Sequence, residues 1–159
     1  MAKELKTNAM RLLDRAKIPY QFHTYEADEF VDGITTAKKL NQPPEQCFKT
    51  LVTHGKSGGY YVFVLPVDKE LDLKKAAKAV GEKSVEMIPV NEINSLTGYI
   101  RGGCSPLGMK KAYPTVVHES AKQYDTIMIS GGRIGMQLEL SPLHLVELIR
   151  GKFEDIIQQ

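Results

Sequence analysis

The side chains that could carry out chemistry are few, and they are spread along the whole sequence. The sequence has four histidines, His23, His54, His118 and His144. They share no spacing typical of metal ligands, such as H-E-x-x-H. We therefore expect no metal site. The two cysteines, Cys47 and Cys104, form neither a disulfide framework nor a metal-binding pattern. What remains is one unusually placed lysine and two glycine-rich turns.

A glycine-rich stretch at residues 96–108 is the most distinctive part of the sequence. It holds four of the 13 glycines, together with Arg101, Cys104 and the Ser105-Pro106 step. Glycine exposes backbone N–H groups and allows positive φ angles, so such a run can wrap around a ligand and hold an anion or a polarised carbonyl. It can equally be a plain connection between strands. Its spacing matches neither G-x-G-x-x-G nor G-x-x-x-x-G-K-[ST], which argues against a nucleotide fingerprint.

Lys49 lies in a segment, residues 47–54, whose alternating pattern predicts a strand. On that strand Lys49 shares a largely apolar face with Cys47 and Leu51. Two interpretations stay open. The lysine either protects an exposed sheet edge and extends toward water, or it points into a pocket and meets an anion.

No side chain is marked as a nucleophile. Cys104 beside glycines could form a thiolate if N–H donors or the nearby Arg101 stabilised it. However, no recognisable motif links it to a histidine or an aspartate. Ser105 and Ser130 lie in turns, where hydroxyl groups more often bond to the backbone than attack a substrate. The sequence therefore disfavours catalysis by a covalent protein intermediate.

Residues 72–81 are the clearest helix, with Asp72 as its N-terminal cap and Gly81 at its end. One side of this helix carries Lys74, Lys75 and Lys78. Such a stripe usually is the solvated face of an amphipathic helix. The alternative is a surface that follows the phosphates of a nucleic acid.

Length and composition indicate one soluble domain. The chain has 159 residues, 42% of them hydrophobic and 25% charged, which suits a single globular unit over residues 1–159. A net charge of +2 is too small to imply nucleic-acid binding by itself. We found no apolar run that could span a membrane and no signal-peptide core at the N-terminus, so we expect a cytoplasmic, reduced protein.

Apolar periodicity predicts the other elements in runs rather than in strict βα alternation. Helices are expected at residues 8–18, 34–40, 72–81 and 142–150, a helical turn at 89–96, and a short helical or turn segment at 119–124. Strands are expected at 20–25, 47–54, 60–65, 85–87, 113–118, 126–130 and 136–140. This order favours an α+β fold with a curved, mixed and largely antiparallel sheet of about six to seven strands and helices packed around it. The second strand of the expected hairpin, residues 60–65, is apolar on both faces and should be central.

Several short pieces of the sequence together resemble one family. They are His23-Thr24-Tyr25, Phe48-Lys49-Thr50-Leu51, residues 71–78, Thr97-Gly98-Tyr99, residues 102–108, Lys110-Lys111 and Ser130-Gly131-Gly132. In this order and spacing they resemble the YbaK/EbsC proteins, the free-standing relatives of the editing domain in bacterial prolyl-tRNA synthetases. The resemblance covers essentially the whole chain, and residues 99–106 are closest to the EbsC-like branch.

This resemblance implies a trans-editing aminoacyl-tRNA deacylase that clears Cys-tRNA(Pro), and by extension Cys-tRNA(Cys), without a cofactor. The implied partners are the 3′ end of aminoacyl-tRNA and, transiently, prolyl-tRNA synthetase. In the implied mechanism the thiol of the substrate attacks its own ester and forms a thiolactone, so the enzyme supplies positioning and electrostatic stabilisation. The alternative is a non-catalytic protein of the same fold that binds tRNA or nucleotides and acts in regulation.

The resemblance also implies roles for individual residues. The catalytic group would be Lys49, on a phosphate or the ester, with N–H groups from Gly102 and Gly103 toward the ester carbonyl. The pocket would be lined by Tyr25, Phe30, Thr50, Ser130 and Gln137, and the tRNA would face Lys74, Lys75, Lys78 and Arg101. Gln137 stands where some relatives carry an acidic residue. Cys104 replaces a more common aliphatic residue, so the family gives it no role as a nucleophile.

Overall fold

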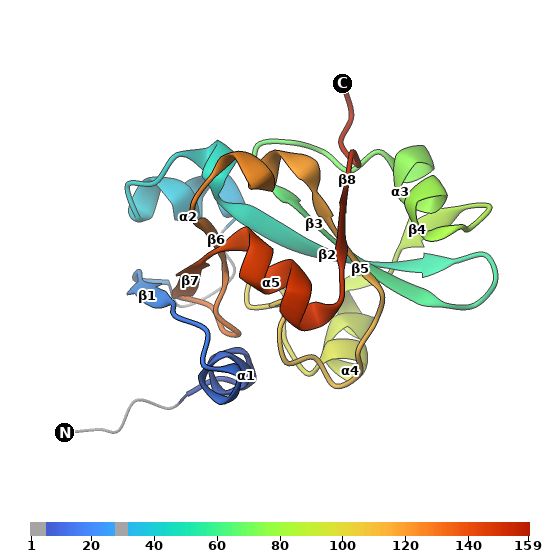
Figure 1. Ribbon diagram of the computed structural model, residues 1–159. Helices are drawn as coiled ribbons and strands as arrows, with labels where there is room; N and C mark the ends of the chain where they lie inside the picture. Colours follow the sequence, from blue (N-terminus) through green and yellow to red (C-terminus); the bar gives the residue numbers. More distant parts are fainter. Residues whose placement is uncertain (1–5, 28–31) are drawn as a thin grey trace.

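The computed structural model describes residues 6–27 and 32–159, and its strands form two hydrogen-bonded sheets (Figure 1). The larger sheet has five strands in the order β4-β2-β3-β5-β8, and the smaller has three in the order β1-β7-β6. An isolated parallel bridge between Cys47 and Met128 links the residue before β2 to β6. The two sheets therefore meet at the start of β2, close to Lys49.

The strands are β1 (Gln21–Thr24), β2 (Phe48–Gly55), β3 (Tyr60–Pro66), β4 (Val85–Met87), β5 (Thr115–His118), β6 (Ile127–Ser130), β7 (Met136–Leu140) and β8 (Lys152–Glu154). The α-helices are α1 (Asn8–Ala16), α2 (Gly33–Lys39), α3 (Leu73–Val80), α4 (Ile93–Thr97) and α5 (Pro142–Ile149). Three 3₁₀ segments complete the described part of the chain, η1 (Pro44–Gln46), η2 (Val90–Glu92) and η3 (Glu119–Gln123).

The α+β prediction is confirmed. The pairs β2–β3, β2–β4, β1–β7 and β6–β7 are antiparallel, while β3–β5 and β5–β8 are parallel, so the sheets are mixed and largely antiparallel. The strand count differs by one, because the described residues contain eight strands and not six to seven. The additional strand is β8, a three-residue segment after the last helix that pairs with β5.

β3 is central in the larger sheet, as its composition predicts, and its two faces pack into separate cores. Val62 and Val64 belong to the main core, whereas Phe63 and Leu65 belong to a second core on the opposite face. The helix α3 covers this second face through Ala76 and other small apolar residues. The helix is thus placed on the side of the sheet away from the main core.

The outer edge of β2 is only partly covered. β4 pairs with Thr53, His54 and Gly55, and the N–H of Ile88 donates to the carbonyl of Val52 at 3.2 Å. Within residues 6–27 and 32–159, no strand pairs with this edge over residues 48–52. The edge therefore forms an open border at the end of the sheet that carries Lys49.

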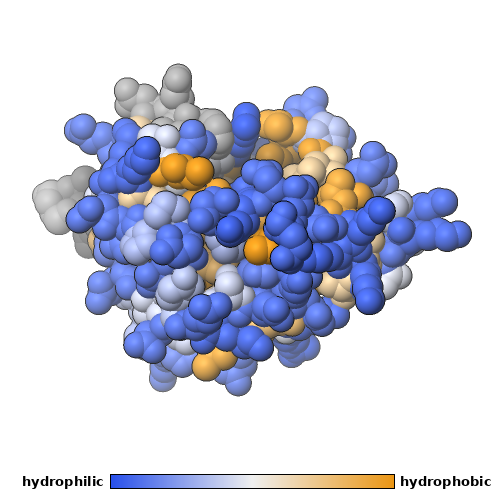
Figure 2. Space-filling model, turned by 90° about the horizontal axis from the view of Figure 1, so that it is seen from above, coloured by the Kyte–Doolittle hydropathy of each residue, from blue (hydrophilic) through white to orange (hydrophobic). Residues whose placement is uncertain are grey.

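The helix ends mostly follow the predicted caps. The carboxylate of Asp72 accepts hydrogen bonds from the N–H groups of Lys74 and Lys75 at 2.9 and 3.0 Å, and Gly81 closes α3 with a φ angle of 74°. The first helix ends earlier than its proline suggests, because Lys17 takes a left-handed conformation directly after Ala16. The face of the molecule shown in Figure 2 is mostly hydrophilic, with separate small apolar patches.

Candidate active site

A cavity of about 650 Å³ opens at the uncovered edge of β2, where the two sheets meet. Its walls come from α2, from β2, from the segment between β4 and α4, and from the ends of β6 and β7. The volume falls in the usual range for a small-molecule site, roughly 300–1,000 Å³. Within the described residues, the cavity is the place where most of the sequence-predicted site residues meet.

Seven of those residues lie in its wall, and they are Tyr25, Lys49, Thr50, Arg101, Gly102, Ser130 and Gln137. The lysine and the glycine-rich stretch are separated by about 50 positions in the sequence, yet they share one hollow. Phe30 lies outside the described residues. The structure therefore brings the expected groups together from both sheets and from the loop after α4.

Lys49 reaches the cavity from a half-covered position. Its side chain is 27% exposed, and its Nζ lies 3.9 Å from Oε2 of Glu70, whose side chain is 78% exposed. On the paired strand it stands opposite Leu65, which is fully buried. The interpretation of Lys49 as a pocket lysine thus describes its surroundings better than that of a solvated edge lysine. Its ammonium group is available to an anion at little cost, because exposed ion pairs are weak.

Thr50, the next residue on β2, contributes a hydroxyl group without a partner. Its Oγ1 is buried and forms no hydrogen bond with any part of the chain that the structure describes. A buried polar atom left without a partner destabilises a folded protein by about 1–3 kcal/mol. Such an atom in a cavity wall suggests a hydrogen bond that a ligand completes.

Within the glycine-rich stretch, residues 100–103 form a turn, and its two glycines, Gly102 and Gly103, have different roles. Gly102 lines the cavity with a φ angle of 87°. Gly103 does not line it, and its N–H donates to the carbonyl of Ile100 at 2.9 Å. A Cβ on Gly103 would lie only 2.7 Å from Cα of Arg133. The expectation that the Gly103 N–H faces an ester is therefore corrected, since Gly103 permits close packing of two backbones instead.

Both cysteines lie in the cavity wall, and both are poor nucleophiles there. Burial raises the pKa of the Cys104 thiol to about 11, and a hydrogen bond with Thr97 opposes this only in part. Burial also raises the pKa of Cys47 to about 11, with a smaller contribution from Glu45. The thiolate fraction of each is therefore minute at neutral pH, which disfavours a thiol esterase that uses Cys104.

A row of polar residues crosses the smaller sheet next to the cavity. Ser130 stands opposite Gln137, and Gln137 stands opposite His23. The Nε2 of His23 lies 2.8 Å from Oε1 of Glu139, and the hydroxyl of Thr126 donates to Oε2 of Glu139 at 2.6 Å. These hydrogen bonds, that of Thr126 first, lower the pKa of Glu139 despite its partial burial. The contact with Glu139 therefore orients the ring of His23, on the strand next to the wall residue Gln137.

The sequence did not identify several residues of the cavity wall. Asp32 lines it while its carboxylate accepts the N–H of Thr35 at 2.7 Å and caps α2. Glu70 comes from the loop after β3, and no local pattern marks it. Ile34, Met87 and Val90 are exposed apolar side chains that also line the cavity.

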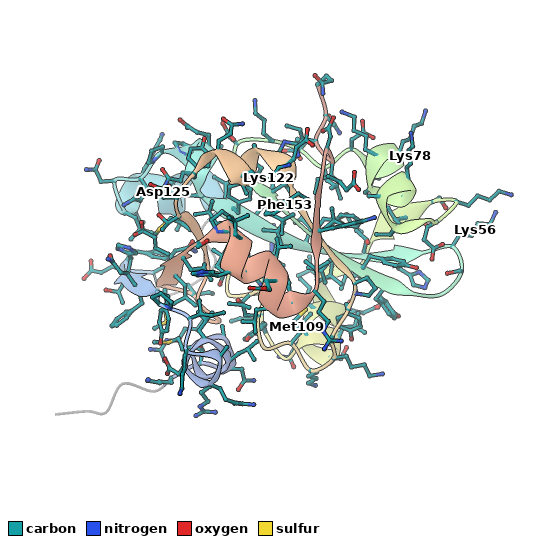
Figure 3. All side chains as sticks on the ribbon, viewed as in Figure 1. Lys56, Lys78, Met109, Lys122, Asp125 and Phe153 are labelled. Atoms are coloured by element: carbon teal, nitrogen blue, oxygen red, sulfur yellow. The ribbon has the colours of Figure 1, made fainter. Side chains whose placement is uncertain are left out.

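The basic helix α3 lies apart from this cavity. The Nζ of Lys75 contacts Asp155 and the carbonyl of Ile157, each at 2.9 Å, so this lysine ties α3 to the C-terminal segment. Lys74 is exposed, and Lys78 extends away from the protein (Figure 3). None of the three lysines lines the cavity. A tRNA surface on α3 stays a prediction, now supported by Lys74 and Lys78 more than by Lys75.

Two general features complete the description of the site. Within residues 6–27 and 32–159, no group of three or more histidine, cysteine, aspartate and glutamate side chains could hold a metal ion. None of the helices described is both long and apolar enough to cross a membrane.

Comparison with known proteins connects this cavity to a family. The family model described as "Aminoacyl-tRNA editing domain" matches residues 31–148, which include the cavity wall apart from Tyr25. A curated protein of Enterococcus faecalis (strain ATCC 700802 / V583), "Putative Cys-tRNA(Pro)/Cys-tRNA(Cys) deacylase EbsC", is 45% identical over 152 residues. That match covers 95% of this chain and 93% of the relative.

Two solved structures share the fold at lower identity. "Hypothetical protein APE2540" has a TM-score of 0.86 and 24% identity, over 95% of this chain and 99% of that one. "A putative trans-editing enzyme for prolyl tRNA synthetase" has a TM-score of 0.81 and 23% identity, over 98% of this chain and 100% of that one. The family model and the curated relative together establish that this chain belongs to the aminoacyl-tRNA editing domain family.

Proposed function

We propose that this protein is a free-standing deacylase that removes cysteine from mischarged tRNA(Pro), with the cavity at the edge of β2 as its active site. The observation that carries the proposal is the meeting of Lys49, Thr50 and Gly102 in one cavity of a chain that is 45% identical to a named Cys-tRNA deacylase. That relative is named for Cys-tRNA(Pro) and Cys-tRNA(Cys), so both are candidate substrates.

The substrate itself supplies the nucleophile in this proposal. The cysteine sulfur attacks the ester carbonyl carbon, the bond from that carbon to the ribose oxygen breaks, and the thiol proton is passed to the ribose oxygen. The products are a cyclic thiolactone and free tRNA. The raised pKa values of Cys47 and Cys104 favour this route over attack by a protein thiol.

The cavity residues would then position the ester and stabilise developing charge. The ammonium of Lys49 would neutralise the terminal phosphate or the carbonyl oxygen, and the backbone of Gly102 would approach the same oxygen. The free hydroxyl of Thr50 would complete its hydrogen bond with the substrate. Tyr25, Ser130 and Gln137 would form the opposite wall.

A panel of charged tRNAs tests this function. With Cys-, Ser-, Ala- and Pro-tRNA(Pro) at equal concentration, we expect release of cysteine to exceed release of serine by a factor of 100 or more, because a hydroxyl is a far weaker nucleophile than a thiol. Equal rates for cysteine and serine would contradict attack by the substrate thiol. No release of any amino acid above the uncatalysed rate would contradict deacylation itself.

We further propose which residues bind the tRNA, and that a protein partner assists this binding. Arg101 at the cavity, and Lys74 and Lys78 on α3, would contact the tRNA backbone. A net charge of +2 makes strong binding to tRNA alone unfavourable, so a transient complex with prolyl-tRNA synthetase would raise the local concentration of substrate. Both partners are found in the cytoplasm, where we expect this protein to act.

A further inference from the structure

The cavity assigned above to the substrate carries charges of both signs. Among the described residues of its wall, Lys49 and Arg101 are cations, and Asp32 and Glu70 are carboxylates. The end of an aminoacyl-tRNA likewise combines anionic phosphates with one cationic group, the α-ammonium of the amino acid. The cations suit the phosphates or the ester oxygen, and a carboxylate is the natural partner of the ammonium.

The two carboxylates are not equally available to a ligand. Asp32 holds the N-terminus of α2, because its Oδ1 accepts the N–H of Thr35 at 2.7 Å. Glu70 lies 3.9 Å from the Nζ of Lys49 with a side chain that is 78% exposed. An exposed pair at this separation is weak and is easily exchanged for a better partner. Glu70 is thus the described carboxylate that can turn to a substrate without loss of a helix cap.

The main chain at Glu70 is fixed even though its side chain is exposed. The N–H of Gln158 donates to the carbonyl of Glu70 at 2.9 Å, and Leu71 forms an antiparallel bridge with Ile157. The N–H of Asp72 donates to the carbonyl of Ile156 at 2.8 Å. The C-terminal segment therefore holds this loop in place and keeps the carboxylate within reach of Lys49.

The separation of the two charges suits an α-amino ester. In such an ester the nitrogen and the carbonyl oxygen lie about 3 Å apart. The Nζ of Lys49 and the Oε2 of Glu70 lie 3.9 Å apart. The positive lysine matches the carbonyl oxygen of the ester, and the negative glutamate matches its ammonium group. The ester can thus place its carbonyl oxygen by the lysine and its ammonium by the glutamate at the same time.

From this geometry, and on the basis of the proposed function, we infer that Glu70 binds the free α-ammonium of the aminoacyl group. It is then a specificity-determining residue that selects aminoacyl esters over N-acylated ones, such as formylated or peptidyl esters. This role also orients the amino acid, because binding at both Lys49 and Glu70 fixes the ester plane.

The test crosses one substitution with one change in the substrate. The variants are wild type, Glu70→Gln and Asp68→Asn, a control that removes the same charge from an exposed position in the same loop. The substrates are Cys-tRNA(Pro) and N-acetyl-Cys-tRNA(Pro) with its thiol left free. N-acetylation also lowers the reactivity of the ester, but this effect cancels when the preference of each variant for the free amine is compared with that of wild type.

We expect Glu70→Gln to lower kcat/KM for Cys-tRNA(Pro) about tenfold, as for loss of a charged hydrogen bond, and to leave the N-acetyl substrate unchanged. Asp68→Asn should resemble wild type with both substrates. Equal effects of Glu70→Gln on both substrates, whether slower or faster, would overturn the inference, because Glu70 would then act only on Lys49 or on the phosphate. No effect on either would also overturn it. If wild type clears neither substrate, the proposed function itself is wrong, a result distinct from all of these.

Discussion

At the scale of single residues, a substitution of Thr50 should affect the stability of the protein and its deacylase activity in different ways. Its buried Oγ1 has no partner in the described structure, so Thr50→Val removes an unsatisfied polar atom at nearly constant volume. We expect the free energy of unfolding to stay equal or rise by about 1 kcal/mol, because folding of the variant no longer buries a hydroxyl group that lacks a hydrogen bond. Deacylation should nevertheless slow by about tenfold if the hydroxyl bonds to the substrate.

Urea unfolding and deacylation rates of the same preparations measure the two effects. Thr53→Val, in which the hydroxyl that is lost bonds to the carbonyl of Tyr61 at 3.0 Å, is the matched control and should lose stability. A Thr50→Val protein that loses more than about 1 kcal/mol would show that Oγ1 has a bonded partner after all.

Cys104 gives a pH dependence with a definite sign. Its thiol has a pKa of 9.0 in the unfolded chain and about 11 in the folded protein. The unfolded state therefore loses its proton first, and the contribution of Cys104 to stability is present below pH 9 and is lost as the pH rises toward 11. We expect Cys104→Ala to flatten this fall, and urea unfolding at several pH values between 8 and 11 would measure it.

The same substitution tests the nucleophile. Because the folded thiol is protonated at neutral pH, Cys104→Ala should retain most of the deacylase activity at pH 7. A loss of activity of more than about 100-fold, with the protein still folded, would contradict a bystander role for Cys104.

The sequence predicted some site residues because their signal is local. Lys49 is a charged residue on an otherwise largely apolar strand face. The residues on either side of it in the sequence are enough to show that this position is unusual. Glu70 gives no such signal, since its position depends on backbone pairing with residues about 85 positions later. Gly103 was misassigned because glycine indicates an accessible backbone but not the direction of its N–H, which a turn with Ile100 determines.

At the scale of the elements, the proposed contact between α3 and tRNA can be tested by charge reversal. Lys74 and Lys78 are exposed, whereas the ammonium group of Lys75 donates a hydrogen bond to the carboxylate of Asp155. We expect the double variant Lys74→Glu, Lys78→Glu to raise KM for tRNA by about tenfold at low salt, with kcat unchanged, because phosphate contacts affect binding and not the ester.

The matched control reverses two charges with the same spacing on another helix. Arg11 and Arg15 are exposed on α1, on the other side of the molecule from α3 (Figure 1). The double variant Arg11→Glu, Arg15→Glu should change KM little. Equal changes in KM for both double variants would contradict a specific tRNA surface on α3 and indicate a general effect of net charge.

Element prediction succeeded where caps and periodicity agree within one segment. Asp72 and Gly81 mark both ends of α3, and Ser141 accepts the N–H of His144 at the start of α5. It failed at β8, whose three residues become a strand only through parallel pairing with β5. It also could not divide the strands between two sheets, because that division depends on contacts across the whole chain.

At the scale of the whole molecule, the candidate active site lies where the two sheets meet and the strand pairing is interrupted. Among the residues that the structure describes, one isolated bridge, between Cys47 and Met128, joins the two sheets, and the cavity lies at the edge of β2 beside that junction. A continuous sheet would cover this edge with another strand. The interruption therefore leaves room for a substrate while both sheets remain anchored in a common core that includes Val62 and Leu138.

We propose that Lys49 acts directly on the aminoacyl ester or its phosphate within this cavity. The most direct measurement is the single-turnover rate of cysteine release from Cys-tRNA(Pro) by Lys49→Ala, with Lys69→Ala, on the exposed loop after β3, as the control. We predict a loss of about 100-fold or more for Lys49→Ala with an unchanged unfolding transition, and little change for Lys69→Ala. A folded Lys49→Ala protein that releases cysteine at the wild-type rate would show that Lys49 takes no part in the reaction.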